Sequence, residues 1–328
     1  MARYWGFWTR GKLDLLRRYL DAFTTASKGQ PEILYLDLFG GQPQNRERLT
    51  EADLDGSARI ALATTDSPFS RLRFFELEPF ASRLRSSLAA DFGDRDFEVV
   101  PGDCNVTIGA ALASLSSVNW APTFAFVDPN GPDVHWSTLE AISKFKKPTL
   151  TKPEIWLLLA AGMFIRTLRT DGTVRDVDAE KLDRMYGTGQ WRAIYEARVT
   201  GMLDPSDARE EYVNLMRWRL QHILGYRRTH PLEIFNERGH SIYHMIFATD
   251  HPAGDRIMTD LYNAAADEFP RMRQEARHRR ERLAEQEAGV QSLFGEKFEV
   301  AAARPRGPRE RLYIHSEPWL PYGSTDPE

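Results

Sequence analysis

The strongest constraint on the fold is a pattern that repeats along the chain. Each repeat is a short apolar run, with an acidic residue at or just after its end, followed by a segment that favours a helix. The runs are Ile33–Phe39, Leu72–Leu77, Phe97–Val100, Thr123–Val127 and one within Glu154–Ala160. Such runs are typical of strands that are buried on both faces of a parallel sheet. Helices between parallel strands make right-handed crossovers and cover the two faces of the sheet. The sequence therefore predicts an α/β fold with a Rossmann-like, doubly wound sheet.

The pattern changes after the fifth run. Residues 167–224 favour helices with a polar start, and we interpret them as an insertion. Two further predicted strands, Leu232–Asn236 and Ser241–Thr249, are separated by a short turn, which makes the pair antiparallel. A parallel sheet that ends in an antiparallel hairpin is the arrangement of class I methyltransferases. We therefore expect a methyltransferase sheet with a helical insertion and a C-terminal helical extension.

Changes in pattern divide the chain into six parts. Leucines at three- and four-residue steps predict an amphipathic helix in the first part, and Gly, Pro and Arg accumulate in the last, as in a linker or tail. The parts are an N-terminal helix (1–30), a Rossmann-like methyltransferase core (31–166), the helical insertion (167–224), the closing antiparallel strands of the core (225–254), a charged helix (255–288) and a linker and tail (289–328).

Cysteine content and charge exclude several classes of protein. Cys104 is the only cysteine, which excludes a disulfide, a cysteine-based zinc site and an iron–sulfur cluster within this chain. A reducing compartment suits this usage, so we expect a cytoplasmic, bacterial-type protein without a metal site. With 43 basic and 47 acidic residues, the net charge of −4 argues against coating of nucleic acid by bulk charge, but permits a basic patch. No apolar run reaches membrane-spanning length and the first residues lack a signal-peptide pattern, so we expect no membrane association.

The first strand ends in a carboxylate and a glycine turn. Asp37 stands just before Gly40 and Gly41. In an open α/β sheet, ligands bind at the carboxyl edge near the topological switch point, and glycines there let the backbone approach a ligand closely. We therefore predict that all three residues bind a cofactor. The alternative is a tight strand-to-helix turn with no ligand.

Further acids stand at the ends of the next two strands. Glu76, or Glu78 two residues on, can accept hydrogen bonds from ribose hydroxyls, and Asp103 can accept one from the exocyclic amine of a purine. Each residue alone is also typical of the start of a helix, where an acidic side chain caps the free backbone N–H groups. Acids at successive strand ends beside a glycine turn favour a cofactor site.

The fourth strand leads directly into a turn that begins with Asp128 and Pro129 and ends with Asn130 and Gly131. The Asp128 side chain and a backbone carbonyl can accept hydrogen bonds from a substrate amine and so orient its nitrogen toward a methyl donor. We predict Asp128 and Pro129 as the catalytic residues. The same four residues also favour an ordinary turn.

Together, these ordered motifs resemble the three-Cys-motif partner protein family. The matching segments are Phe7–Thr9, Lys12–Leu20, Leu36–Gly41, Gly102–Asn105, Phe126–Gly131 and Trp136, then Arg166, Gly187, Trp191 and Tyr243–Ile257. They cover most of residues 5–265. The family is named for its neighbour, a protein with a radical-SAM-like trio of cysteines, and its members resemble class I methyltransferases that use S-adenosylmethionine.

The resemblance implies S-adenosylmethionine as the cofactor and a three-cysteine radical-SAM-like protein as a partner. It places cofactor contacts at Asp37, Gly40, Glu76 and Asp103, and a substrate-facing turn at Asp128 and Pro129. The chain departs from the family in the glycine turn, where Ala-Gly-Pro-Gly-like residues are usual. Here Pro43 replaces the second glycine. Proline has no N–H and a fixed φ, so the departure predicts reduced or lost cofactor affinity.

Two functions remain open. The first is an S-adenosylmethionine-dependent methyltransferase that acts on nucleic acid or on a nucleotide-like substrate. The second is a non-catalytic, methyltransferase-like partner protein that binds or regulates the three-cysteine protein. The retained acids favour the first function and Pro43 favours the second.

Two basic patches stand out in this acidic chain. The segment Arg271–Arg282 holds six arginines and two glutamates, a balance of +4 on one helix, and we predict phosphate contacts at Arg277 and Arg280. The alternative is a solvated helix face. The lysines between Lys144 and Lys152 form a second patch, which we place near the substrate edge, with Lys144 and Lys147 as DNA or RNA contacts. In the tail, Gln291–Phe294 resembles peptides that bind the bacterial sliding clamp, although local burial of its apolar residues also explains it.

Overall fold

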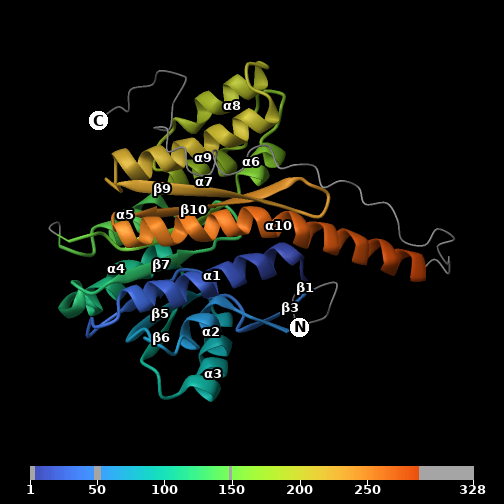
Figure 1. Ribbon diagram of the computed structural model, residues 1–328. Helices are drawn as coiled ribbons and strands as arrows, with labels where there is room; N and C mark the ends of the chain where they lie inside the picture. The colour runs from blue at the N-terminus through green and yellow to red at the C-terminus, as the bar shows by residue number, and fades with distance from the viewer. Residues whose placement is uncertain (1–3, 48–52, 148–149, 288–328) are drawn as a thin grey trace.

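A seven-stranded sheet runs through the computed structural model, which describes residues 4–47, 53–147 and 150–287 (Figure 1). Its strands, in spatial order, are β6 (Phe97–Pro101), β5 (Arg71–Glu76), β2 (Leu34–Asp37), β7 (Thr123–Val127), β8 (Glu154–Leu159), β10 (Ser241–Thr249) and β9 (Arg228–Phe235). All neighbours are parallel except β10, which is antiparallel to both β8 and β9. The protein thus has a Rossmann-like sheet that closes in an antiparallel hairpin, as expected for a class I methyltransferase fold.

The chain reverses its direction of growth across the sheet between β2 and β7. From β2 it builds outward through β5 to β6, then returns to the other side of β2 and continues through β7 and β8. Connections on the two sides of such a switch point diverge, which leaves a crevice at the carboxyl ends of the strands. In this crevice three of the acids predicted from the sequence, Glu76, Asp103 and Asp128, come together.

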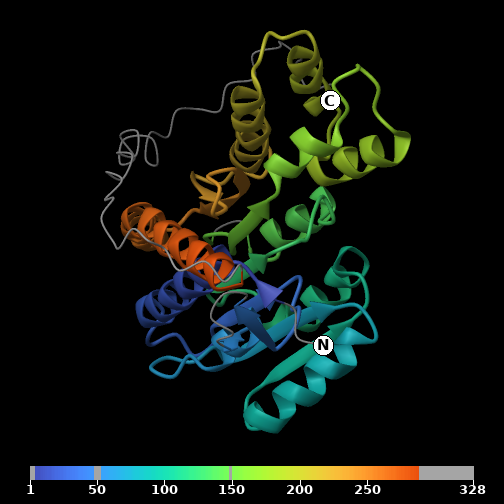
Figure 2. The same cartoon turned by 90° about the vertical axis from the view of Figure 1, so that its right-hand side faces the viewer.

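Helices cover both faces of the sheet (Figures 1 and 2). They are α1 (Phe7–Ala26), α2 (Ser57–Leu62), α3 (Phe80–Phe92), α4 (Cys104–Ser114), α5 (Trp136–Ser143), α6 (Ala161–Thr167), α7 (Asp176–Tyr186), α8 (Trp191–Val199), α9 (Pro205–His222) and α10 (Pro252–Glu287), with a short 3-10 helix at Ser116–Val118. One core forms between the sheet and α1, α2, α3 and α10, and the other between the sheet and α4 to α9. In Figure 2 the yellow-green helices of the insertion stand together at one end of the molecule.

The central strands are buried on both faces because their residues are apolar without alternation. Tyr35 faces the α1 side, where its ring lies 6.0 Å from that of Phe124, while its neighbours Leu34 and Leu36 face the α4 side. Tyr19 of α1 stacks into the same cluster, with ring centroids 5.2 Å from Phe124. Aromatic pairs of this kind add about 0.5–1.5 kcal/mol each beyond the burial of their area. They fix α1 across the sheet.

A second, small sheet of β1 (Tyr4–Trp5), β3 (Gln44–Glu47) and β4 (Asp53–Asp55) lies beside the glycine turn that follows β2. Gly56 ends this sheet, and its N–H donates to the Pro43 carbonyl over 2.9 Å. A Cβ on Gly56 would stand 2.2 Å from the Gln42 carbonyl oxygen, so only glycine allows this approach. The turn after β2 is therefore tied to a hairpin rather than left free.

Helix α10 is much longer than the sheet is deep. At 1.5 Å per residue, its 36 residues span about 54 Å. It packs along α1, where Arg18 Nη1 donates to Glu268 over 3.1 Å and Gly11 contacts the Phe269 ring. The second half of the helix projects beyond α1 (Figure 1). No helix in the described parts of the chain combines the length and the apolar character needed to cross a membrane.

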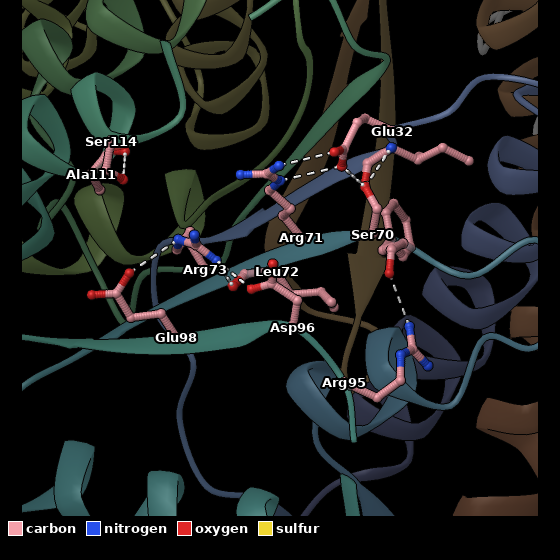
Figure 3. A network of polar contacts seen from close by, with 12 residues as sticks. Glu32, Ser70, Arg71, Leu72, Arg73, Arg95, Asp96, Glu98, Ala111 and Ser114 are labelled. Carbon is pink, nitrogen blue, oxygen red and sulfur yellow. Dashed lines mark hydrogen bonds and ion pairs between the residues drawn. The ribbon is translucent and has the colours of Figure 1, made fainter. Parts of the chain in front are cut away.

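Ion pairs tie together the amino ends of β2, β5 and β6 (Figure 3). Arg71 Nη2 lies 2.9 Å from Glu32 just before β2, and the buried Arg73 lies between Asp96, at 3.6 Å, and Glu98, at 3.1 Å. Because these carboxylates face cations of neighbouring strands, they fix the register of the sheet.

Candidate functional site

A cavity of about 500 Å³ opens at the carboxyl ends of β2, β5, β6 and β7. Its volume lies within the range of about 300–1,000 Å³ typical of small-molecule sites. Five residues predicted from the sequence line it: Gly40, Gly41, Glu76, Asp103 and Asp128. The structure therefore brings together residues from four different strand ends that are up to 88 positions apart in the sequence, between Gly40 and Asp128.

Glu76 connects the end of β5 to the glycine turn. One carboxylate oxygen accepts from Gly41 N over 2.7 Å and the other from Leu77 N over 2.8 Å. Gly41 has φ +63°, a conformation that favours glycine and aims its N–H at this carboxylate. Each oxygen keeps a second lone pair for a hydroxyl donor. Glu78, the alternative, instead accepts from the Ser82 hydroxyl over 2.9 Å in the first turn of α3.

Asp103 caps helix α4, as its alternative interpretation allowed. Its Oδ1 accepts from Asn105 N over 2.8 Å and from Asn105 Nδ2 over 2.9 Å. The Asn105 amide also donates to Asp133 O and accepts from His135 N and the Thr138 hydroxyl, each over 2.8 Å. All hydrogen-bonding positions of that amide are thus occupied. Asn105, which the sequence marked only as part of a motif, holds the loop after β7 against the start of α4.

Asp37 was expected to contact a cofactor, but it lies behind the cavity wall. It is fully buried and accepts from Phe39 N over 3.3 Å, from Tyr35 Oη over 3.4 Å and from the Ser57 hydroxyl. Burial raises the pKa of Asp37 to about 7, and nearby Asp128 adds to that rise. The side chain therefore braces the glycine turn and α2. Pro129 is likewise buried and does not line the cavity.

Asp128 forms an ion pair with Lys12 of helix α1 inside the cavity. The Lys12 side chain is only 10% exposed and the Asp128 side chain 24%. Sequence reasoning did not assign Lys12 to the site, although a signal was present. Lys12 stands four residues before Leu16 and so lies on the buried stripe of an amphipathic helix, where an unpaired lysine is unfavourable.

Pro43, the departure from the family pattern, does not line the cavity. Its carbonyl accepts from Gly56 in the small sheet, while Gly40, Gly41 and Gln42 form the cavity wall. The N–H that proline lacks is therefore not removed from the wall itself. Because Pro43 lies outside the cavity wall, its missing N–H gives no direct reason to expect a lower cofactor affinity.

The cavity wall also offers an apolar surface beside Glu76. Leu77 and Phe80 are 55% and 39% exposed, so they leave apolar surface open to a ligand. A flat aromatic or purine ring can cover them. Cys104 also lines the cavity, but burial raises the pKa of its thiol to about 12, so it is not a thiolate nucleophile at neutral pH.

The structure separates the two predicted basic patches. The segment from Lys144 to Lys152 leads into the amino end of β8, and Lys152 Nζ lies 3.0 Å from Asp250 just after β10. Since amino ends of parallel strands share one edge, Lys144 and Lys147 lie at the edge opposite the cavity. The expectation that this patch adjoins the substrate edge was wrong. Arg277 and Arg280 lie on the projecting half of α10, and Gln291–Phe294 falls outside the described residues.

In the parts of the chain that the structure describes, no group of three or more His, Cys, Asp or Glu side chains is placed to hold a metal ion. The cavity presents carboxylate hydrogen-bond acceptors, lysine and arginine donors and apolar surface. These are the elements of an organic cofactor site.

Comparisons with known proteins do not show a family or an activity for this chain. No family model matches the sequence, and no curated protein matches it. Among solved structures, EvdMO1 has 13% sequence identity and a TM-score of 0.36, over 73% of this chain and 42% of its own length. Protein LPL1258 from Legionella pneumophila has 11% identity and a TM-score of 0.39, over 73% of this chain and 85% of its own. Because both TM-scores are below 0.5, the methyltransferase-like fold rests on the strand order of this chain, and membership of the three-Cys-motif partner family stays a prediction.

Proposed function

We propose that the protein is an S-adenosylmethionine-dependent methyltransferase that acts on nucleic acid or on a nucleotide-like acceptor. The observation that carries this proposal is the convergence of Glu76, Asp103 and Asp128 on one cavity at the switch point of the sheet. Each stands at the end of a different strand. Fold alone does not establish an activity, so the weight lies on these side chains.

The residues present fit such a cofactor. Glu76 would hold the ribose hydroxyls through its remaining lone pairs, Leu77 and Phe80 would cover the purine, and Asp103 would accept from its amine. Gly40 and Gly41 would let the backbone approach the methionine part. The bound cofactor would supply a methyl group on a positively charged sulfonium. An acidic cavity wall favours a cation of this kind.

Asp128 would accept a hydrogen bond from the acceptor nitrogen and turn the nitrogen lone pair toward the methyl group. Lys12 fixes the carboxylate in place through the ion pair between α1 and the loop after β7. Orientation of two reacting groups lowers the barrier because the entropy of alignment has already been lost on binding.

Titration of the full-length protein with S-adenosylhomocysteine, followed by calorimetry and by thermal shift, tests the proposal. We expect saturable binding and a rise in melting temperature, because a ligand that binds only the folded state stabilises it. Adenosine, which lacks the amino-acid part, should bind more weakly. Neither heat nor a thermal shift at millimolar ligand would contradict the cofactor assignment.

One observation favours the second function, a non-catalytic partner of the three-cysteine protein. In the described structure, Glu76 already accepts two backbone N–H groups and Asp128 already pairs with Lys12, so both acids have internal partners. Co-purification with the three-cysteine protein, together with an absence of S-adenosylhomocysteine binding, would select this function.

A further inference from the structure

Helix α7 of the insertion reaches the cavity that the strand-end acids line. Lys181 and Arg184 of this helix line the cavity. They are three residues apart, so they lie on the same face of the helix, one turn from each other. Neither residue belongs to a motif that the sequence singled out.

The place of α7 over the cavity is fixed by contacts at its end. Gly187 terminates the helix with φ +65°, and a Cβ there would stand 2.5 Å from the Trp136 ring at the start of α5. The Arg219 guanidinium lies over the Trp136 ring, 4.5 Å from the ring centroid. Leu182 and Tyr186 are buried in the core beneath. These contacts determine which face of α7 lies toward the cavity.

Asp183, the acid next to Arg184 in α7, is directed to helix α8. Asp183 accepts from Trp191 Nε1 over 2.8 Å and from Arg192 Nη2 over 2.7 Å, both on α8. Arg184 has one exposed ion pair, with Glu180 at 3.7 Å, of the kind that adds at most about 1 kcal/mol. Lys181 has no ion pair with any residue that the structure describes. The two cations therefore face the cavity with donors to offer.

We propose that Lys181 and Arg184 bind a phosphate group of the methyl acceptor. The cavity carries charges of both signs, because its lining holds the strand-end acids and, from α7, Lys181 and Arg184. The acids suit a sulfonium cofactor and the two cations suit an anion. Arginine and lysine side chains are the usual donors to phosphate oxygens. The methyl acceptor would then be a molecule that carries phosphate. The role of this molecule as a methyl acceptor rests on the proposed function, whereas the binding of phosphate by Lys181 and Arg184 does not.

Fluorescence anisotropy with a short labelled oligothymidylate tests the proposal in the full-length protein. Its bases are pyrimidines, so the probe does not mimic the purine of the cofactor. A probe of the same length with a neutral methylphosphonate backbone serves as the matched ligand. The variant Lys181→Glu/Arg184→Glu is compared with Lys28→Glu/Arg227→Glu, which changes the net charge equally at two exposed positions just before β2 and β9, at the amino edge of the sheet.

We expect the wild type to prefer the charged probe, the α7 variant to lose at least about tenfold in affinity, and the control variant to stay within about twofold. Binding of S-adenosylhomocysteine should be equal in all three proteins. Equal losses of oligothymidylate affinity in both variants, or no binding of this probe by the wild type, would overturn the proposal. So would an α7 variant that loses affinity for S-adenosylhomocysteine but keeps its affinity for oligothymidylate. If oligothymidylate binds and S-adenosylhomocysteine does not, the phosphate site stands and the proposed methyltransferase function fails.

Discussion

The two edges of the central sheet both carry acidic residues, but they use them differently. At the amino edge, Glu154 is 5% exposed and accepts from the hydroxyls of Tyr19 and Thr249 under helices α1 and α10. At the carboxyl edge, Glu76 and Asp128 open into the cavity. An acidic residue at a strand end therefore does not by itself indicate a ligand-binding site. What distinguishes the acids is their surroundings: Glu154 is enclosed by residues of α1 and β10, whereas Glu76 and Asp128 line the crevice at the switch point.

The same contrast holds for lysine–aspartate pairs. Lys152 pairs with Asp250 at the amino edge over 3.0 Å, and Asp250 also accepts from Arg227 N over 2.9 Å. Lys12 pairs with Asp128 at the carboxyl edge, where both side chains line the cavity. The first pair joins two loops, whereas the second lines the cavity. Variants at equivalent positions of the two edges can therefore separate stability from function.

The largest effect is expected from removal of the buried acid at the amino edge. Glu154→Ala should lower the free energy of unfolding by about 3 kcal/mol, because it leaves the Tyr19 and Thr249 hydroxyls without their acceptor in a buried site. Urea unfolding monitored by tryptophan fluorescence measures this loss. A change below about 1 kcal/mol would show that the cluster does not hold α1 on the sheet.

The pH dependence of this acid provides a second readout. Burial raises the pKa of Glu154 from 4.5 to about 7. Between these values the folded state holds a proton that the unfolded state has lost, so the stability contribution is full below pH 4.5 and falls as pH rises to about 7. Glu154→Gln cannot titrate. The stability of the wild type relative to Glu154→Gln should fall by up to about 3 kcal/mol over this range, and a constant difference would contradict the prediction.

The next effect concerns turnover. Asp128→Asn keeps the size of the side chain but removes its charge and weakens the pair with Lys12, so we expect methyl transfer to fall at least about 100-fold, near 2.7 kcal/mol. Affinity for S-adenosylhomocysteine should stay within about twofold. Transfer of radiolabelled methyl groups measures the loss.

The matched control is Asp250→Asn, which weakens the equivalent pair at the amino edge. It should lower stability while each folded molecule keeps the parental rate. Parental turnover in Asp128→Asn, or an equal loss in Asp250→Asn, would remove Asp128 from the reaction.

A moderate effect is expected on cofactor binding. Glu76→Ala should weaken S-adenosylhomocysteine by about 1–3 kcal/mol, the usual result of losing hydrogen bonds to a charged acceptor, and should also release Gly41 N. Calorimetry compares it with Glu32→Ala, which breaks an ion pair with Arg71 at the amino edge. Equal affinities in the two variants would show that Glu76 only braces the glycine turn.

The smallest effect is expected from the projecting half of α10. Arg277 Nε already lies 3.0 Å from Glu281, so we expect Arg277→Glu/Arg280→Glu to remove about one phosphate contact and to lower the log–log salt slope of oligonucleotide binding by about 0.7–0.9. Anisotropy titrations between 50 and 200 mM salt, a range that resolves such slopes, measure it. An unchanged slope would identify a solvated face, or a surface for an acidic protein partner.

The sequence by itself determined the sheet. Apolar runs such as Thr123–Val127 are local signals, and the structure forms a strand over these same residues. The short turn before Ser241–Thr249 also settled the antiparallel pairing, since a tight turn permits no other. Even the error about Lys144 and Lys147 was avoidable, because a loop that leads into a parallel strand always lies at the amino edge.

Only the tertiary structure decided which side chains share the cavity. Lys12 reaches Asp128 across 116 positions of the sequence, and Lys181 and Arg184 come from an insertion whose place depends on the contact between Gly187 and Trp136. Pairings of this kind depend on how helices pack on the sheet, and no local pattern encodes that packing. Strand periodicity is fixed by neighbours along the chain, whereas the charge and shape of a cavity are fixed by neighbours in space.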